Sequence, residues 1–218
     1  MKKPLIGLVD YDMGNLRSVT KAMEFLGART RWVESPGQLA GLNALVLPGV
    51  GAYARAMQNL RKQKLVGALQ DWIIAGRLFL GICLGYQLLF TESEESQIPN
   101  ETVRGLGIVP GKVVRFQRKK NLRVPHMGWN TVRFKKTAEE RSGFEKKLFA
   151  GIKDNDYFYF VHSYYPENRA AHEVATLTNY HLDFASSIVR ANLFASQFHP
   201  EKSSAGGMRL LKNFVSII

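Results

Sequence analysis

Residues 78–87 of this chain, Leu-Phe-Leu-Gly-Ile-Cys-Leu-Gly-Tyr-Gln, decide the fold. The apolar run over 78–82 predicts a buried strand, and the segment over 84–90 predicts the start of a helix. The only cysteine, Cys83, lies at the junction, with a glycine two residues before it and another two residues after it. This spacing is typical of a nucleophile elbow, a sharp strand-to-helix turn that leaves no room for side chains at the flanking positions.

Outward from this stretch, short apolar runs alternate with amphipathic patterns through the first half of the chain. Such alternation is typical of βαβ units, which form a parallel sheet with helices on both faces. The pattern predicts strands over 5–9, 30–33 and 44–47, and helices over 16–26 and 54–75, the last in two pieces around Gly67.

After Gly105 the pattern changes to strands without intervening helices, which predicts an antiparallel or mixed section. We therefore expect an α/β fold in one domain over residues 1–218. Its central, mostly parallel sheet is flanked by helices, and its antiparallel or mixed section lies in the C-terminal half. The strands predicted here span 113–116, 131–134, 157–161, 174–177, 187–189 and 193–198, and a closing helix spans 208–218.

The composition narrows the class of protein. The chain has 218 residues, 45% hydrophobic and 22% charged, which excludes disordered, fibrous and disulfide-stapled classes. No run approaches the roughly 18 apolar residues of a membrane span, and the N-terminus lacks a signal-peptide pattern. A single cysteine can form no internal disulfide. We therefore expect a soluble, cytoplasmic protein with no membrane partner.

The net charge of +12 is unevenly distributed. Three interpretations of its densest stretch stay open: a nucleic-acid surface, a surface that docks an acidic protein, or a solvated basic face. No helix-turn-helix, zinc-finger or RNA-recognition signature accompanies the stretch, so we expect no nucleic-acid partner. The eight basic residues are Arg115, Arg118, Lys119, Lys120, Arg123, Arg133, Lys135 and Lys136.

Cys83 is a candidate nucleophile. The elbow exposes its sulfur and aims the first amides of the following helix at it, and these amides and the helix dipole stabilise a thiolate. The amide of Leu84 is placed to stabilise an oxyanion. A buried structural cysteine is the alternative for a lone cysteine, but the Gly-x-Cys-x-Gly spacing favours the nucleophile.

A thiol nucleophile needs a base and a group that orients the base. His199 follows a strongly apolar strand, and Glu201 lies two residues further on, so both face the same way in an extended chain. Glu201 is therefore the candidate that holds the His199 ring in one tautomer. The alternatives are a surface histidine or half of a metal site. No second ligand cluster appears, so we expect no metal. The other histidines are His126, His162, His172 and His181.

The segment Pro48-Gly49-Val50-Gly51 also follows a strand. Two glycines around one residue allow unusual backbone angles and close approach to a ligand. This segment is a candidate source of the second oxyanion donor, and an ordinary strand-end turn is the alternative.

Together, residues 81–87 and Phe-His-Pro-Glu over 198–201 resemble the class I, triad-type glutamine amidotransferases. Three further segments narrow the resemblance to the glutaminase subunits of imidazole glycerol phosphate synthases of histidine biosynthesis. It covers the chain from about Leu5 to the C-terminus. Val50 replaces the proline that anthranilate-type relatives usually carry, and Asp12 replaces a residue that is often small in the family. The three segments are Tyr-Asp-Met-Gly-Asn over 11–15, Pro-Gly-Val-Gly over 48–51 and Pro-His-Met-Gly-Trp-Asn over 125–130.

The resemblance implies a reaction without a cofactor. Cys83 attacks the side-chain amide of glutamine, His199 carries the proton and Glu201 orients His199, after which water hydrolyses the thioester. The remaining residues it implies are the oxyanion-hole segment Gly49, Val50 and Gly51 with Leu84, the glutamine-binding side chains Gln87 and Glu95, and the backbone of Ser163 and Tyr164 for the substrate carboxylate.

The resemblance also implies a heterodimer with a (β/α)8-barrel cyclase that receives the ammonia. Trp129 and Lys202 match family positions at that interface, and core packing for Trp129 or solvation for Lys202 are the plainer interpretations. Two other functions stay open. One is a related triad enzyme, including an amidotransferase of a sister pathway, and the other is a basic nucleic-acid-binding module.

Overall fold

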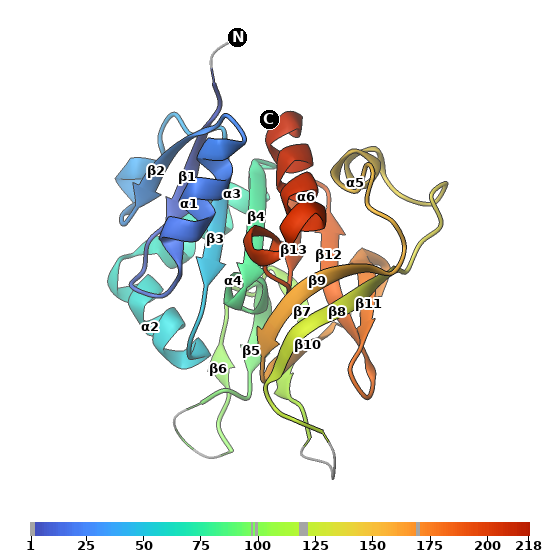
Figure 1. Cartoon of the computed structure of the whole chain (residues 1–218). Helices are drawn as coiled ribbons and strands as arrows, with labels where there is room; N and C mark the ends of the chain where they lie inside the picture. Colours follow the sequence, from blue (N-terminus) through green and yellow to red (C-terminus); the bar gives the residue numbers. More distant parts are fainter. Residues whose placement is uncertain (1–2, 97, 99, 118–121, 169–170) are drawn as a thin grey trace.

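The computed structural model describes residues 3–96, 98, 100–117, 122–168 and 171–218 (Figure 1). Its main feature is a sheet of nine strands, which are β1 (Leu5–Val9), β2 (Arg29–Val33), β3 (Ala44–Gly49), β4 (Leu78–Cys83), β8 (His126–Phe134), β9 (Asp156–His162), β11 (Val174–Asn179), β12 (Asp183–Arg190) and β13 (Leu193–Ser196). Their order across the sheet is β2-β1-β3-β4-β13-β12-β11-β8-β9.

The sheet has a parallel half and an antiparallel half. Neighbours from β2 to β13 run parallel, and neighbours from β13 to β9 run antiparallel. The predicted fold class is confirmed. β13 comes late in the sequence but completes the parallel half, because it pairs with β4 in register Leu193 with Phe79 through Ser196 with Ile82.

A second, smaller sheet of mixed direction has the order β10-β7-β5-β6. It begins directly after the elbow, so the chain turns from the parallel sheet into this sheet beside Cys83. Its strands are β5 (Phe90–Ser93), β6 (Val103–Arg104), β7 (Val109–Arg115) and β10 (Tyr164–Asn168).

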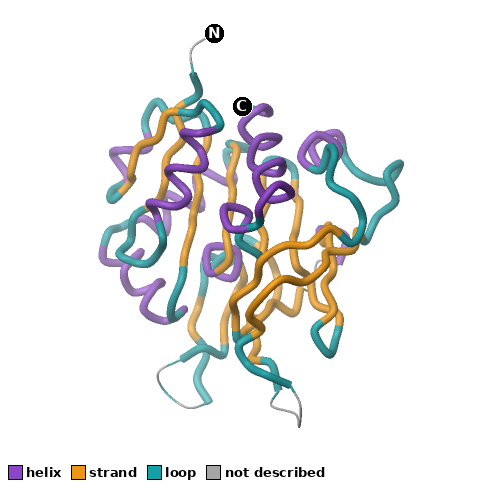
Figure 2. Tube along the Cα trace, in the orientation of Figure 1, coloured by secondary structure: helices purple, strands orange, loops and turns teal. Residues whose placement is uncertain are grey.

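Helices cover both faces of the parallel half, as Figure 2 shows. The two faces are covered by α1 (Leu16–Phe25) and α6 (Ser204–Ile217) on one side and by α2 (Tyr53–Lys62) and α3 (Leu65–Ile74) on the other. The other helices are α4 (Leu84–Gln87) and α5 (Gly143–Leu148), with short 3-10 turns η1 (Pro36–Leu39), η2 (Ala171–Glu173) and η3 (Pro200–Lys202).

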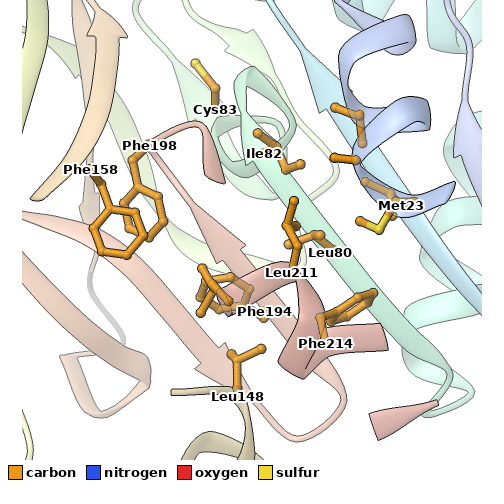
Figure 3. Packing of buried hydrophobic residues seen from close by; sticks show 14 of the residues in the cluster. Met23, Leu80, Ile82, Cys83, Leu148, Phe158, Phe194, Phe198, Leu211 and Phe214 are labelled. Atoms are coloured by element: carbon orange, nitrogen blue, oxygen red, sulfur yellow. The ribbon is translucent and has the colours of Figure 1, made fainter. Parts of the chain in front are cut away.

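Alternation along β4 sends its side chains into two separate cores. Leu80 and Ile82 pack with α1 and α6 on one face (Figure 3), whereas Phe79 packs with α2 and α3 on the other. Phe79, Leu80 and Ile82 are all buried. The strand that carries Cys83 is therefore held from both sides.

The structure differs from the sequence prediction in several elements. The break between α2 and α3 lies at Lys64, whose left-handed backbone (φ 59°) ends α2, while Gly67 lies inside α3. The helix after Cys83 is a single turn, because Phe90 already begins β5. The strand predicted over 193–198 ends at Ser196. The sequence pattern did not predict β5, β6, β10 or α5. Among the described residues, no helix has the length and apolar character to cross a membrane.

Candidate active site

Cys83 occupies a strained elbow between β4 and α4. Its backbone lies at φ 53° and ψ −105°, a region that residues other than glycine rarely adopt. A side chain at Gly85 would clash with the Leu47 carbonyl oxygen, and one at Gly81 would press on Ala195 at 3.0 Å. The predicted need for both glycines is thus confirmed. One part of the expectation is wrong: a four-residue helix has almost no macrodipole, so the local amides are left to stabilise a thiolate.

His199 follows β13 and stands beside the elbow because β13 and β4 are parallel neighbours whose carboxyl ends meet at one edge. Its backbone N–H donates to the Tyr159 carbonyl at 2.9 Å, and its own carbonyl accepts from the Ser203 hydroxyl at 2.6 Å. The residue is 2% exposed. These bonds fix the backbone of His199, so its ring has little freedom to move.

Glu201 contacts the imidazole as the sequence predicts. His199 Nδ1 lies 2.9 Å from Glu201 Oε1, and both side chains are 2% exposed. A carboxylate can only accept, so Nδ1 carries a proton. His199 Nε2 has no hydrogen-bond partner among the described residues. This second nitrogen is therefore free to exchange a proton with Cys83 or a substrate.

The charge state of His199 follows from its neighbours. Burial alone would lower the pKa of His199, but Cys83 and Glu201 outweigh burial and raise that pKa to about 10. The imidazole is therefore protonated at neutral pH and is ready to donate a proton.

A pocket of about 310 Å³ opens at the elbow. It brings together most of the predicted substrate-binding residues with Cys83. Gly49, His199, Glu201, Trp129 and Lys202 do not line it. The lining residues are Val50, Gly51, Cys83, Leu84, Gln87, Glu95, Pro125, Val161, His162, Ser163 and Tyr164.

The two glycines of the 48–51 segment are needed for different reasons. Gly49 pairs with Cys83 across β3 and β4, and a side chain there would clash with the Tyr11 hydroxyl. Gly51 has a φ of 102°, which L-residues disfavour. The loop therefore lies beside Cys83, where Val50 and Gly51 line the same pocket.

The polar side chains of Gln87 and Glu95 also line the pocket. The Glu95 carboxylate accepts from the Tyr53 amide at 3.1 Å, and burial raises the pKa of Glu95. Gln87 Nε2 donates to the Tyr164 carbonyl at 2.9 Å, which leaves Gln87 Oε1 for a ligand. Both free oxygens are acceptors, so they can bind the ammonium group of an amino acid.

A buried histidine pair, His126 and His162, adjoins the pocket and was not predicted from the sequence. His162 Nδ1 lies 2.8 Å from the Tyr164 carbonyl, so this nitrogen carries the proton. His162 Nε2 then accepts from His126 Nδ1 at 2.9 Å, and His126 Nε2 accepts from the Asn130 amide at 3.2 Å. Burial lowers the pKa of His126 to about 4 and, together with His126, that of His162 to about 3. Both rings are therefore neutral. Only the position of His162 directly before Ser163 could have drawn attention to it.

The neutral pair predicts a pH dependence of stability. Between about pH 4 and 6.5 the unfolded chain protonates these histidines and the folded chain does not, so stability falls as pH falls. His199 does not contribute to this pH dependence of the unfolding free energy, because it is protonated in both the folded and the unfolded chain below pH 6.5. We expect His162→Gln to reduce the slope of unfolding free energy by about 1.4 kcal/mol per pH unit between pH 5 and 6. Urea unfolding at several pH values measures this, and parallel curves for the two proteins would contradict it.

Trp129 and Lys202 lie outside the pocket at the surface. Trp129 is 49% exposed and contacts Tyr159 edge-on, so core packing is not its role. The same ribbon of β8 and β9 exposes Met127 and Tyr157. An apolar surface therefore adjoins the strand that anchors His199.

Two residues of the basic stretch over 115–136 already form ion pairs within the chain. Arg133 pairs with Asp183 at 2.7 Å, and Lys136 pairs with buried Glu145 at 3.3 Å. Arg118, Lys119 and Lys120 lie outside the described residues. The stretch is thus in part an ordinary ion-paired surface. Among the described residues, no group of three or more His, Cys, Asp or Glu side chains could hold a metal ion.

Comparison with known proteins adds to this geometry. The model of the family "Glutamine amidotransferase class-I" matches residues 8–218. Two relatives are each named "Imidazole glycerol phosphate synthase subunit HisH". The one from Moorella thermoacetica is 46% identical and covers 98% of this chain and 95% of its own length. The one from Thermosynechococcus vestitus is 44% identical and covers 100% and 99%.

Solved structures show the same fold at lower identity. PurLQS from Thermotoga maritima superposes with a TM-score of 0.74 at 17% identity, covering 99% of both chains. A structure described as a glutamine amidotransferase superposes with a TM-score of 0.67 at 20% identity, covering 97% of both.

Proposed function

The chain belongs to the glutamine amidotransferase class-I family and, within it, to the imidazole glycerol phosphate synthase HisH subunits, and on this premise we propose that Cys83, His199 and Glu201 form its catalytic triad. As a member of this family it is a glutaminase subunit that serves histidine biosynthesis. The observation that carries the assignment is the His199 ring, which is bound to Glu201 through Nδ1, keeps Nε2 for proton transfer and interacts electrostatically with Cys83.

In the proposed first step, Cys83 Sγ attacks the side-chain amide carbon of glutamine. The oxyanion that forms accepts hydrogen bonds from the amide of Leu84 and from that of Val50 or Gly51. The carbon–nitrogen bond then breaks, and the protonated His199 Nε2 supplies the proton with which ammonia leaves. A glutamyl thioester remains on Cys83.

In the second step, neutral His199 takes a proton from water, and the hydroxide equivalent attacks the thioester. The carbon–sulfur bond breaks, glutamate leaves and the sulfur is ready for another cycle. Glu201 holds the ring through Nδ1 in both steps. Gln87, Glu95 and the backbone of Ser163 and Tyr164 bind the amino-acid end of the substrate.

The reaction is tested by release of glutamate and ammonia from glutamine. We expect a glutamine analogue with a thiol-reactive group to block the release, to add one equivalent to the chain and to be recovered on Cys83 by mass spectrometry. Labelling elsewhere, or blocked release with unlabelled Cys83, would contradict the proposed site.

The chain is a synthase subunit, and its partner is proposed to be a (β/α)8-barrel cyclase in a heterodimer. This partner would use the ammonia to form imidazole glycerol phosphate and AICAR. The exposed apolar ribbon with Trp129, and Lys202 on η3, support a protein interface beside the pocket. Co-purification with a barrel subunit tests the partner. A partner from another amination pathway would favour the sister-pathway alternative. A cytoplasmic location is also proposed, because a catalytic thiol works best in a reducing compartment.

A further inference from the structure

Gln197 is a buried polar residue that the proposed mechanism leaves unused. It is 0% exposed and lies between β13 and His199, with its backbone N–H bonded to the Ser186 carbonyl at 2.8 Å. Its side chain spans the space between α4 and the elbow. Gln197 Oε1 lies 2.9 Å from Gln87 Nε2, and Gln197 Nε2 lies 3.6 Å from Cys83 Sγ.

The orientation of this amide follows from the network around it. The Tyr164 carbonyl can only accept, so the Gln87 group that faces it is the NH₂ group. The same NH₂ group faces Gln197, which must therefore present its oxygen to Gln87. The NH₂ group of Gln197 is then left pointing at the sulfur of Cys83. A flipped Gln197 amide would bring two NH₂ groups together, and neither could accept from the other.

The Tyr164 carbonyl anchors this series of hydrogen bonds. It accepts from Gln87 Nε2 and also from His162 Nδ1, which lies 2.8 Å away. Two donors from different elements therefore hold one acceptor at the rim of the pocket. The hydrogen bonds of Gln87 therefore fix the orientation of the Gln197 amide. The Gln197 N–H points at the Cys83 sulfur whether or not the sulfur accepts a hydrogen bond.

We propose that Gln197 is a positioning residue of the glutaminase reaction, whose side-chain N–H holds and stabilises the Cys83 thiolate. The inference rests on the proposed triad and deepens it. Hydrogen bonds to charged groups contribute more than neutral ones, and this donor acts on sulfur as nucleophile and as leaving group. It complements His199, which must release its own proton to ammonia and cannot stabilise the sulfur at every step.

Other ionisable groups also face the elbow and must stay constant in any test. His199 and Glu201 approach from the β13 side. Tyr11 approaches from β1, and burial raises the pKa of its hydroxyl, which stays protonated. Glu95 and His162 line the pocket. A change confined to Gln197 alters none of these groups, so a shift in sulfur reactivity reports the amide alone.

The test is the rate of Cys83 alkylation by iodoacetamide in the full-length chain, measured across pH, together with glutamine turnover. Gln197→Met keeps the volume and removes the donor. We expect the midpoint of the alkylation profile to rise by about one pH unit, and kcat/KM for glutamine to fall roughly 10- to 100-fold. The matched control is Ser186→Ala, which removes a neighbouring buried hydroxyl, bonded to Thr176 at 2.9 Å, without touching the sulfur. Its profile should match the wild type.

Gln87→Met provides a second variant that leaves Gln197 in place but frees its amide to rotate. We expect the alkylation midpoint of Gln87→Met to rise by less than that of Gln197→Met. The midpoint of the double variant should be no higher than that of Gln197→Met alone, because both substitutions act through one hydrogen bond. An unchanged profile in folded Gln197→Met, or fully additive shifts, would overturn the proposal. Alkylation needs no glutamine, so this failure is distinguishable from failure of the triad, which would show as glutamine turnover that survives loss of Cys83.

Discussion

Cys83→Ala is expected to reduce glutamine hydrolysis by far more than a hundredfold while the fold is retained. The alanine variant cannot form the thioester, and loss of a covalent nucleophile removes the whole two-step pathway. Alanine at φ 53° is about as strained as cysteine, so the unfolding free energy should change little. Initial rates of glutamate release, with thermal unfolding of the same samples, measure both effects.

Two further variants act as controls on the interpretation. His199→Ala should cost nearly as much as Cys83→Ala, because the members of a triad act as a unit. Glu201→Gln should cost less, since loss of the acidic member of a triad costs less than loss of the nucleophile or the base. More than about a hundredth of wild-type turnover in Cys83→Ala would show that another residue is the nucleophile.

The second large effect concerns the 48–51 segment. We expect the isolated chain to hydrolyse glutamine poorly, and the barrel partner with its nucleotide ligand to raise kcat by orders of magnitude. A glycine-rich loop can turn a peptide N–H toward the oxyanion site or away from it, and loss of one oxyanion donor costs roughly 10²–10³ in rate. A partner shifts this equilibrium only as far as it binds one state better than the other.

A substitution at Gly51 tests this equilibrium. Gly51→Ala disfavours the present φ of 102° and should remove most of the activation by the partner. Gly41→Ala is the matched control, because Gly41 also has a positive φ of 75° but lies in open space and outside the pocket lining. Turnover is compared for the chain alone, with partner, and with partner plus ligand. Equal kcat in all three states would refute a switch in this loop.

The elbow and the orienting carboxylate could be predicted because their geometry is local. Gly81, Cys83 and Gly85 lie within one turn, and His199 and Glu201 lie two residues apart, so residue spacing alone specifies their arrangement. The confirmed close packing at Gly85 and the 2.9 Å contact of His199 with Glu201 are consequences of such spacing.

Long-range partners could not be predicted in the same way. Gln197 and His162 have no distinctive spacing, and their importance arises only when four separate strands and α4 bring Gln87, Tyr164 and Cys83 together. The helix after Cys83 was predicted, but its short length was not, for a related reason. The periodicity over 84–90 suits a helix, but Phe90 pairs with Val109 in the second sheet, and tertiary pairing overrides local preference.

The place of β13 in the sheet has a consequence for how the protein is made. Cys83 ends β4, whereas β13, His199 and Glu201 are translated more than a hundred residues later. A nascent chain can form the β2-β1-β3-β4 units early, since domains begin to fold from the N-terminus during synthesis. It cannot complete the reactive thiol's surroundings until β13 docks against β4, a contact between segments more than a hundred residues apart in sequence. If the proposed triad is correct, chains that end before β13 are expected to release no ammonia from glutamine.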